Sequence, residues 1–293
     1  MNKFIVATDS GCDLSREVCE EKDIRILYMT YEIDGMLYKD TMKVDDIKEY
    51  YKGMEEGNVV HTGAINISDY IDFWEPMLEE KLPIVHITLG SGISGTYMNG
   101  TLAREEIMQE HPDAEICLVD STHASTSYGM LALKAAEMRD AGATAEECVK
   151  ALEELKPKIN AYYTTDDLSY LYRGGRVSRS GKIIAHALGI CPILNLDDKG
   201  CLKVFDKCRG KKSTFNRIKQ IAKELVINPE EQILYICHSN IEDFAEAYGK
   251  EITEELGFKG YKTFYIGTTI GAHTGPGLIA IFFVGKERTP AKK

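Results

Sequence analysis

The stretch Ile84-Val85-His86-Ile87-Thr88-Leu89-Gly90-Ser91-Gly92 changes from apolar to small polar residues, and a helix-like segment around Leu102 to Met108 follows it. The apolar run has the length of a buried strand, and the glycines and serine that end it are typical of a turn. The same order of strand, polar loop and helix recurs after Phe4–Ala7 and after Ile116–Val119. Such alternation predicts a parallel sheet covered by helices on both faces.

An insertion near residues 24–40 interrupts this order. Asp34-Gly35 suits the tight turn of a β-hairpin. Before the turn, apolar side chains recur at every second position, at Leu27, Met29, Tyr31 and Ile33. The stretch from Ile26 to Leu37 is therefore predicted to form a small hairpin attached to the first sheet.

The second half of the chain has a different pattern. Two apolar stretches, Cys191–Leu196 and Leu202–Phe205, flank a four-residue turn that ends in Gly200, which predicts an antiparallel hairpin. The elements expected after it are helices at Ser213–Leu225 and Ile241–Leu256, and strands at Ile233–Cys237, Thr263–Ile266 and Leu278–Val284. These elements predict an α+β unit with a mainly antiparallel sheet.

The predicted fold class is therefore α/β with two domains. An N-terminal parallel-sheet α/β domain is expected over residues 1–157, and a C-terminal α+β domain over residues 158–293. The change of pattern and the proline in Lys156-Pro157-Lys158 place the boundary there.

Composition and charge exclude several classes of protein. The chain has 293 residues, with 35 Lys and Arg against 46 Asp and Glu, so its formal net charge is −11. An acidic chain lacks the broad positive field that favours nonspecific nucleic-acid binding or an anionic membrane surface. No apolar window approaches the roughly 18 residues of a membrane span, and the N-terminus lacks a signal-peptide pattern. Eight cysteines without a C-x-x-C pair are typical of a reducing compartment, so a cytoplasmic location is expected.

The glycine-rich segment at residues 90–95 is the first candidate site. It formally matches the dinucleotide fingerprint G-x-G-x-x-G, and Asp120 ends the next predicted strand. Backbone N–H groups at a helix start bind any anion, a carboxylate as well as a phosphate, and Ser94 and Thr96 add hydroxyl donors. A tight turn with capping hydroxyls explains the same residues without a ligand.

Three other segments carry candidate residues. Thr62 lies between Val59-Val60-His61 and Gly63, in what reads as a loop. Tyr172–Lys182 contains four cations, among them Arg176, and suits a phosphate, an acidic partner protein or a solvated connector. His273 precedes a Gly-Pro-Gly turn that can direct it into a cleft, although such a histidine can equally cap a strand end.

A complete catalytic set is not apparent. The sequence contains no G-x-S-x-G elbow, no H-E-x-x-H motif and no Walker lysine motif. His186 and His238 lie within or beside apolar runs and are expected to be core residues. Arg209 follows a predicted strand, where a lone arginine is usually surface charge. No metal site and no cofactor are predicted.

Taken together and in order, these segments resemble the DegV family of bacterial fatty-acid-binding proteins. The resemblance covers almost the whole chain, through Thr8-Asp9-Ser10, the segment 90–97, Asp120-Ser121, Arg173–Ser178, Pro192–Leu194, Lys207–Arg209 and His273–Gly277. One segment departs from the pattern: Thr62-Gly63-Ala64-Ile65 stands where the family usually carries Thr-Ser-Gln-Pro.

The resemblance implies a two-domain DegV-like (EDD) fold with one long-chain fatty acid between the domains. It implies that Thr62 and Ser94, with Gly95, bind the carboxylate, and that His273 and Arg209 are its neighbours on the C-terminal domain. Secondary candidates at positions of the matched motifs are Asp9, Ser10, Gly92, Thr96, Ser121 and Arg176. The implied role is non-catalytic: the protein presents the carboxylate to a separate ATP-dependent fatty-acid kinase, related to dihydroxyacetone kinases, that makes acyl phosphate for phospholipid synthesis.

Two alternatives remain open on the residues alone. The first is an enzyme that binds a phosphate or nucleotide at residues 90–95, with Asp9 and Asp120 as metal-holding acids. The second is a lipid sensor that has no kinase partner.

Overall fold

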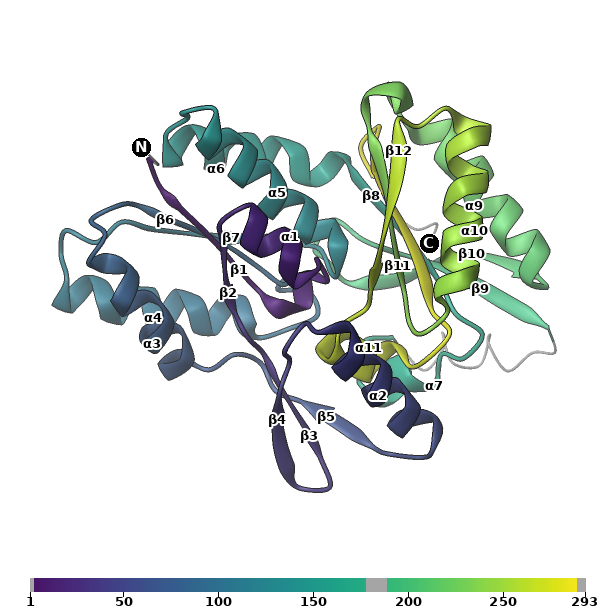
Figure 1. The fold of residues 1–293 in the computed structure, drawn as a ribbon, viewed down its shortest axis with the longest axis horizontal. Coiled ribbons are helices and arrows are strands. Elements are labelled where there is room, and N and C mark those ends of the chain that lie inside the picture. The colour runs from purple at the N-terminus through teal and green to yellow at the C-terminus, as the bar shows by residue number, and fades with distance from the viewer. Residues whose placement is uncertain (1–2, 178–188, 289–293) are drawn as a thin grey trace.

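The computed structural model describes residues 3–177 and 189–288, and two sheets organise them (Figure 1). The first sheet has the order β2-β1-β6-β7, and every neighbouring pair is parallel. Its strands are β1 (Ile5–Asp9), β2 (Ile24–Leu27), β6 (Ile84–Thr88) and β7 (Ile116–Asp120). All residues of β1 and β6 are buried, as expected for central parallel strands. The predicted parallel sheet is confirmed.

Helices cover both faces of this sheet. Two long helices, α5 (Thr126–Asp140) and α6 (Ala145–Leu155), pack together on one face, and α3 (Ile67–Leu78) and α4 (Thr96–Glu110) pack together on the other (Figure 1). A shorter helix, α1 (Arg16–Glu21), connects β1 to β2. Within the described ranges, no helix has both the length and the apolar character needed to cross a bilayer.

The predicted hairpin near residues 24–40 is only partly correct. Residues 24–27 form β2 of the parallel sheet, and the hairpin consists of β3 (Thr30–Ile33) and β4 (Met36–Lys39). Its turn is at Asp34 and Gly35, both with positive φ, as expected. The alternation of apolar residues runs across two strands of different sheets, and the sequence pattern does not show with which neighbour each strand pairs.

A third strand completes this small sheet. β5 (Val60–Thr62) pairs antiparallel with β3, so Thr62 lies on a strand and not in the predicted loop. The intervening helix α2 (Val44–Glu55) packs its buried tyrosines, Tyr50 and Tyr51, toward the C-terminal half of the chain.

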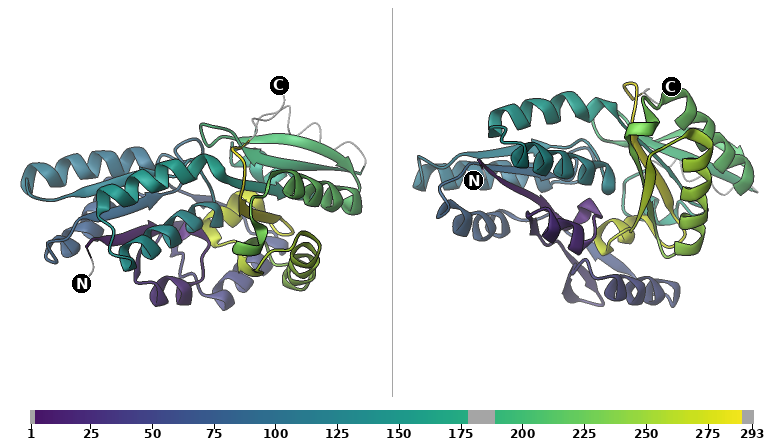
Figure 2. Two further views of the ribbon diagram at one scale, coloured as in Figure 1. Left: turned by 90° about the horizontal axis from the view of Figure 1, so that it is seen from above. Right: turned by 45° about the horizontal axis from the view of Figure 1, so that its top comes forward.

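The second sheet has the order β10-β9-β8-β13-β11-β12, and only the β11–β12 pair is parallel. Its strands are β8 (Ile159–Thr164), β9 (Ile190–Leu196), β10 (Leu202–Arg209), β11 (Ile233–His238), β12 (Gly260–Tyr265) and β13 (Ile279–Val284). The predicted antiparallel character and the β9–β10 hairpin are confirmed. Strand β8 was not predicted. Two helices, α9 (Lys211–Leu225) and α10 (Glu242–Leu256), pack against this sheet, which lies beside the first one in Figure 2.

The two sheets meet through short elements. The chain passes from α6 to β8 through a 3-10 helix, η2 (Lys156–Lys158), where the domain boundary is predicted. Two further 3-10 helices are η1 (Ser10–Cys12) and η3 (Pro229–Glu231). The helices α7 (Ser169–Arg173) and α11 (Thr268–Thr274) pack on each other between the sheets (Figure 1). Helix α11 also packs against β5 and η1 of the N-terminal half.

Candidate functional site

Side chains of the N-terminal half anchor helix α11. The buried Asp13 carboxyl group accepts a hydrogen bond at 2.8 Å from the N–H of Gly267, the residue that directly precedes the helix. The Tyr51 hydroxyl donates to the Ile266 carbonyl and the Tyr50 hydroxyl donates to the Thr268 carbonyl, both at 2.9 Å. Because these contacts fix α11 from outside its own sheet, they also fix the position of His273 on its last turn.

The His273 ring contacts Thr62 of strand β5. The distance from Nε2 to Thr62 Oγ1 is 2.7 Å, and the pairing of Thr62 with Tyr31 in the small sheet holds the threonine in place. Burial and, to a smaller extent, the charge of the nearby Arg176 together lower the pKa of His273 to about 4. The imidazole is therefore neutral at pH 7, and both its nitrogens and the threonine oxygen are available for hydrogen bonding without a second charge.

Ser94 lies just before helix α4 and is oriented by Thr96. The two hydroxyl oxygens are 2.8 Å apart, and the Thr96 N–H donates to Ser94 Oγ at 3.2 Å. Thr96 Oγ1 also accepts the Ile65 N–H at 3.4 Å. When Thr96 donates its own proton to Ser94, the Ser94 oxygen is satisfied as an acceptor and its proton is free to donate elsewhere. Gly95, the N-cap residue of α4, offers no side chain to cap the helix.

Arg176 supplies a cation beside these groups. Its Nε donates to the Ile93 carbonyl at 3.0 Å, and its Nη1 donates to the Gly174 carbonyl. Burial lowers the pKa of this guanidinium, which still remains charged at pH 7. Among the described residues that line the adjoining pocket, Arg176 is the only one with a permanently charged side chain.

The polar end, by which we mean Thr62, Ser94, Gly95, Arg176 and His273, belongs to a pocket between the two sheets. The pocket has an empty volume of about 830 Å³, counting the part open to solvent. Its other walls are mainly apolar and come from both halves of the chain: Met29, Leu89, Ala124, Leu171, Leu194, Leu196, Leu202, Ile266, Ile270 and Leu278. An apolar pocket with one anion-binding end suits an amphiphile that has a single acidic head.

The glycines of residues 90–95 have a different role from that of a dinucleotide fingerprint. A Cβ on Gly90 would lie 2.7 Å from the His123 backbone, and one on Gly92 would lie 2.3 Å from the Lys199 carbonyl oxygen. The close approach is therefore made by the protein's own backbone. Asp120 accepts hydrogen bonds from the N–H and hydroxyl of Ser91 and from the Thr122 N–H, so its carboxylate holds the loop.

Five of the six secondary candidates do not line the pocket: Gly92 and Thr96, described above, and Asp9, Ser10 and Ser121. The last three have structural partners. Burial raises the pKa of Asp9 to about 6, and its carboxylate accepts hydrogen bonds from the Leu89 and Gly11 N–H groups and from the Tyr128 hydroxyl. The Ser10 hydroxyl accepts the Met29 N–H, and Ser121 accepts the His123 N–H. All three side chains are buried and stabilise strand ends.

Arg209 is not brought to the polar end. It is exposed at the last position of β10, whereas the pocket is lined by Leu202 at the first position of that strand. Of the other three cations in residues 172–182, Arg173 ends α7 and lies over the Tyr170 ring. Arg179 and Lys182 lie outside the described residues, as does His186. His238 is buried, and its Nδ1 accepts the Ile241 N–H, as expected for a core histidine.

The apolar walls could have been recognised from the sequence in part. Leu194 and Leu196 are two positions apart on a strand and therefore share a face. The anchoring residues Asp13 and Tyr51 have no local signal, because each contacts a segment more than 200 positions away.

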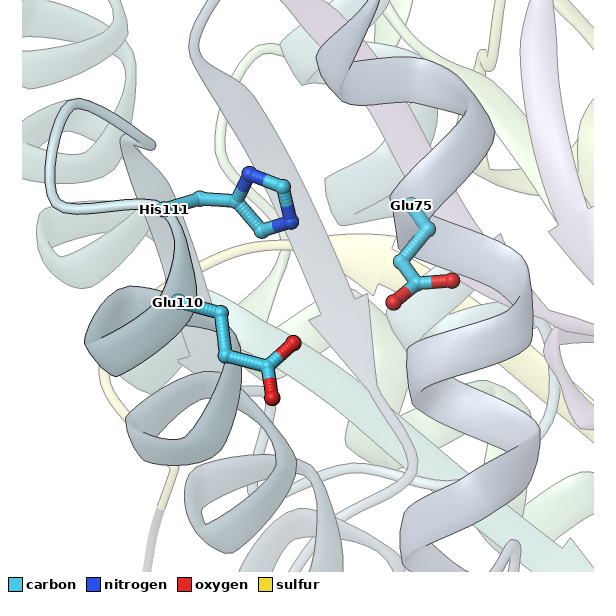
Figure 3. Close-up of side chains that lie close together, drawn as sticks. All are labelled: Glu75, Glu110 and His111. Atoms are coloured by element: carbon cyan, nitrogen blue, oxygen red, sulfur yellow. The ribbon is translucent and has the colours of Figure 1, made fainter.

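One group of side chains with metal-ligand spacing lies elsewhere. Glu75 of α3 and Glu110 and His111 at the end of α4 place their ligand atoms within 4.8 Å of one another (Figure 3). All three side chains are exposed, and exposed acidic groups often come this close without an ion. We assign no metal site to them.

Comparison with known proteins identifies the family of this chain. The family model described as "Uncharacterised protein, DegV family" matches residues 3–286. The chain belongs to the DegV family. A DegV domain-containing protein of Clostridium perfringens is 34% identical over 291 residues, which is 99% of this chain and 100% of the relative.

Solved DegV-type structures share the fold. A stearic acid-binding protein from Eubacterium ventriosum superposes with a TM-score of 0.87 at 24% identity, over 97% of this chain and 98% of that one. DegV of Bacillus subtilis, described as a fatty acid binding protein, superposes with a TM-score of 0.83 at 27% identity, over 98% of this chain and 100% of that one. The mixed α/β fold and its two sheets are thus those of the DegV family.

Proposed function

We propose that this DegV-family chain binds one long-chain fatty acid in the pocket and holds its carboxylate at the polar end. The observation that carries the proposal is the pocket itself, whose walls are mainly apolar and whose polar end contains two hydroxyls, a neutral imidazole and one guanidinium. The description of the Bacillus subtilis relative as a fatty acid binding protein supports the same ligand class.

The polar end has the donors that a buried carboxylate needs. A buried anion costs several kcal/mol unless its lone pairs are satisfied. In this proposal Ser94 donates the proton that Thr96 leaves free, and Thr62 donates when His273 carries its proton on Nε2 toward Thr62 Oγ1. The Arg176 guanidinium and the start of helix α4 beside Gly95 favour the negative charge.

The tail supplies most of the binding energy. A sixteen-carbon acid has on the order of fifteen methylene and methyl groups, each contributing about 0.8 kcal/mol when buried, or about 12 kcal/mol in total. Loss of translational and conformational freedom reduces this figure. The head group therefore fixes orientation, while the leucine-rich walls determine affinity.

The proposal extends to the transfer of the bound acid to a kinase. A separate ATP-dependent fatty-acid kinase would transfer the γ-phosphoryl group of ATP to a carboxylate oxygen, giving acyl phosphate and ADP, in the cytoplasm. The present chain is the non-catalytic carrier in this scheme.

Residues that lie opposite each other in an antiparallel pair share a face, and Lys207 and Arg209 lie opposite Pro192 and Ile190.

This register places both cations on the face of β9–β10 that carries Leu194 and Leu196 into the pocket. Lys207 and Arg209 are exposed on an edge strand of a chain with a net charge of −11. An acidic surface on a kinase would be attracted to this local positive charge at the far end of the strand that begins at the pocket. Arg209 is therefore proposed as a partner contact and not as a carboxylate ligand.

Two measurements test the two parts of the proposal separately. Organic extraction and native mass spectrometry of the purified protein should find one fatty acid per chain, and none after delipidation followed by incubation with a short-chain acid. Failure to bind any long-chain acid would overturn the whole proposal. The lipid complex, a fatty-acid kinase from the same source and ATP should then give acyl hydroxamate when hydroxylamine is added. Binding without this product would favour a lipid sensor.

A further inference from the structure

Cys191 and Cys208 lie directly opposite each other in the β9–β10 hairpin. Directly opposite residues of an antiparallel pair have Cα atoms about 4.5–5.5 Å apart and point to the same face. Disulfide bonds span Cα distances of about 4.4–6.8 Å. Both thiols are free, so the backbone already holds two unlinked cysteines at a separation that a disulfide bond requires.

The two thiols lie together on one face of the hairpin. Both cysteines lie on the face of the hairpin toward α9, opposite to the face that lines the fatty-acid pocket. Burial raises the pKa of both thiols. At neutral pH both are thiols, so their proximity, and not an activated thiolate, favours their reaction with each other.

Small oxidants can reach this pair. Cys191 contributes to an open pocket of about 660 Å³ of empty volume beside Lys211 and Phe244, and Cys208 is half-buried. Two other pairs of cysteines are close together among the described residues: Cys12 and Cys19, which are 0% and 1% exposed, and Cys117 and Cys148, of which Cys148 is 0% exposed. The hairpin pair differs from both, because Cys191 lines an open pocket and Cys208 is half-buried.

We infer that Cys191 and Cys208 are a reversible oxidation site, in which hydrogen peroxide converts the two thiols of the hairpin into a disulfide bond. Peroxide first oxidises the more exposed thiol, Cys208, to a sulfenic acid and releases one water. The Cys191 sulfur then attacks the sulfenic sulfur, the S–S bond forms and a second water leaves. The sum is two thiols and one peroxide to one disulfide and two waters, with two electrons passing from sulfur to peroxide. A small dithiol reverses the reaction by exchange.

The test is mass-spectrometric mapping of the intact protein after oxidation. The reduced, folded chain is treated with hydrogen peroxide, unfolded in urea, alkylated and digested with trypsin. The expected product joins peptide 183–199, which contains Cys191, to the dipeptide Cys208-Arg209 and is lighter than the two thiol peptides together by two hydrogen atoms. Six of the eight cysteines remain alkylatable, and dithiothreitol restores all eight.

Matched variants show whether the pairing is specific. Cys191→Ser and Cys208→Ser should each keep the other cysteine out of any disulfide bond, and Cys201→Ser, in the turn of the same hairpin, should leave the linked peptide unchanged. Circular dichroism shows whether each variant is folded. Conversion of Cys208 to sulfinic acid without the linked peptide in the wild-type chain would overturn the inference, as would loss of two thiols in Cys191→Ser. The fatty-acid proposal is independent of either result.

Discussion

Thr62 Oγ1 and His273 Nε2 lie 2.7 Å apart although 211 positions separate the two residues in the chain. Strand β5 positions the first, and a helix anchored by Asp13 positions the second. The polar end of the pocket therefore exists only when both halves of the chain are assembled, and neither half contains it alone.

Replacing Ser94 by alanine should weaken fatty-acid binding roughly 10- to 100-fold, because a hydrogen bond to a charged group contributes about 1.5–3 kcal/mol. Isothermal titration calorimetry with palmitate measures the dissociation constant. Thr101→Ala is the matched control, since its hydroxyl donates to the Tyr97 carbonyl on the same helix and it does not line the pocket. An unchanged constant for Ser94→Ala would exclude Ser94 from carboxylate binding.

Thr96→Val should weaken binding less than Ser94→Ala, because Thr96 acts through the orientation of Ser94. The double variant Ser94→Ala/Thr96→Val should bind about as weakly as Ser94→Ala alone, since the second change has nothing left to orient. Calorimetry on the four proteins of this cycle measures the coupling. Strictly additive losses would show that Thr96 contributes independently of Ser94.

Asp40→Asn should stabilise the protein more at pH 8 than at pH 5. Burial raises the pKa of Asp40 from 3.8 to about 6, so the folded state binds more protons than the unfolded state between these values. Stability is therefore lost as the pH rises through this window, by about 3 kcal/mol in full and by about 1 kcal/mol between pH 5 and pH 8.

Urea unfolding of the wild type and of Asp40→Asn at both pH values measures this difference. Asp45→Asn, which removes an exposed carboxylate from the first turn of α2, is the matched control. Buried histidines titrate in both proteins and cancel in the comparison. A pH-independent effect of Asp40→Asn would contradict the assigned titration.

Gly92→Ala should lower the melting temperature, whereas Gly95→Ala should change it little. The new methyl group at position 92 would lie 2.3 Å from the Lys199 carbonyl oxygen, and overpacking against backbone typically costs about 1–3 kcal/mol. At position 95 the nearest atom is Ala64 Cβ at 3.7 Å, an ordinary contact. Differential scanning fluorimetry compares the two, and equal melting temperatures would contradict the close packing of the β9–β10 turn on this loop.

Arg209→Glu should leave fatty-acid affinity unchanged and reduce the rate of acyl-phosphate formation roughly tenfold at low salt, because a charge reversal at an interface slows association. The hydroxamate assay with the kinase measures this rate, and calorimetry measures binding. Lys250→Glu, on the exposed side of α10, is the control. A loss of fatty-acid affinity in Arg209→Glu would show that Arg209 contributes to carboxylate binding and would contradict its assignment as a partner contact.

The order of helices and strands was predictable because buried elements place apolar residues at regular spacings along the sequence. Apolar runs such as Ile84–Leu89 predicted central parallel strands, and the hairpin around Gly200 was recognisable from its turn. Strand β5 was missed because three residues are too few to show a period, and its partner β3 lies elsewhere in the sequence. Leu27 was assigned to the hairpin for a related reason: the sequence does not show that its strand, β2, pairs with β1.

The polar end was predictable only in its residue types. Ser94 and His273 were visible from glycine-rich turns and from family resemblance, which state what a residue is but not where it lies. The position of Arg209 could not be inferred, because the length of β10, from Leu202 to Arg209, separates it from the pocket. Conversely, Arg176 reaches the pocket through contacts with Ile93, 83 positions away.

The walls of the pocket come from both halves of the chain, so a bound ligand that contacts both halves stabilises their association. Mass action then links occupancy to resistance against unfolding, and a hundredfold excess of ligand over its dissociation constant adds about 2.7 kcal/mol. Protein without bound lipid would unfold more readily than the lipid complex and would be degraded faster. The cellular level of such a carrier would thus follow the supply of its cargo, without any dedicated sensor.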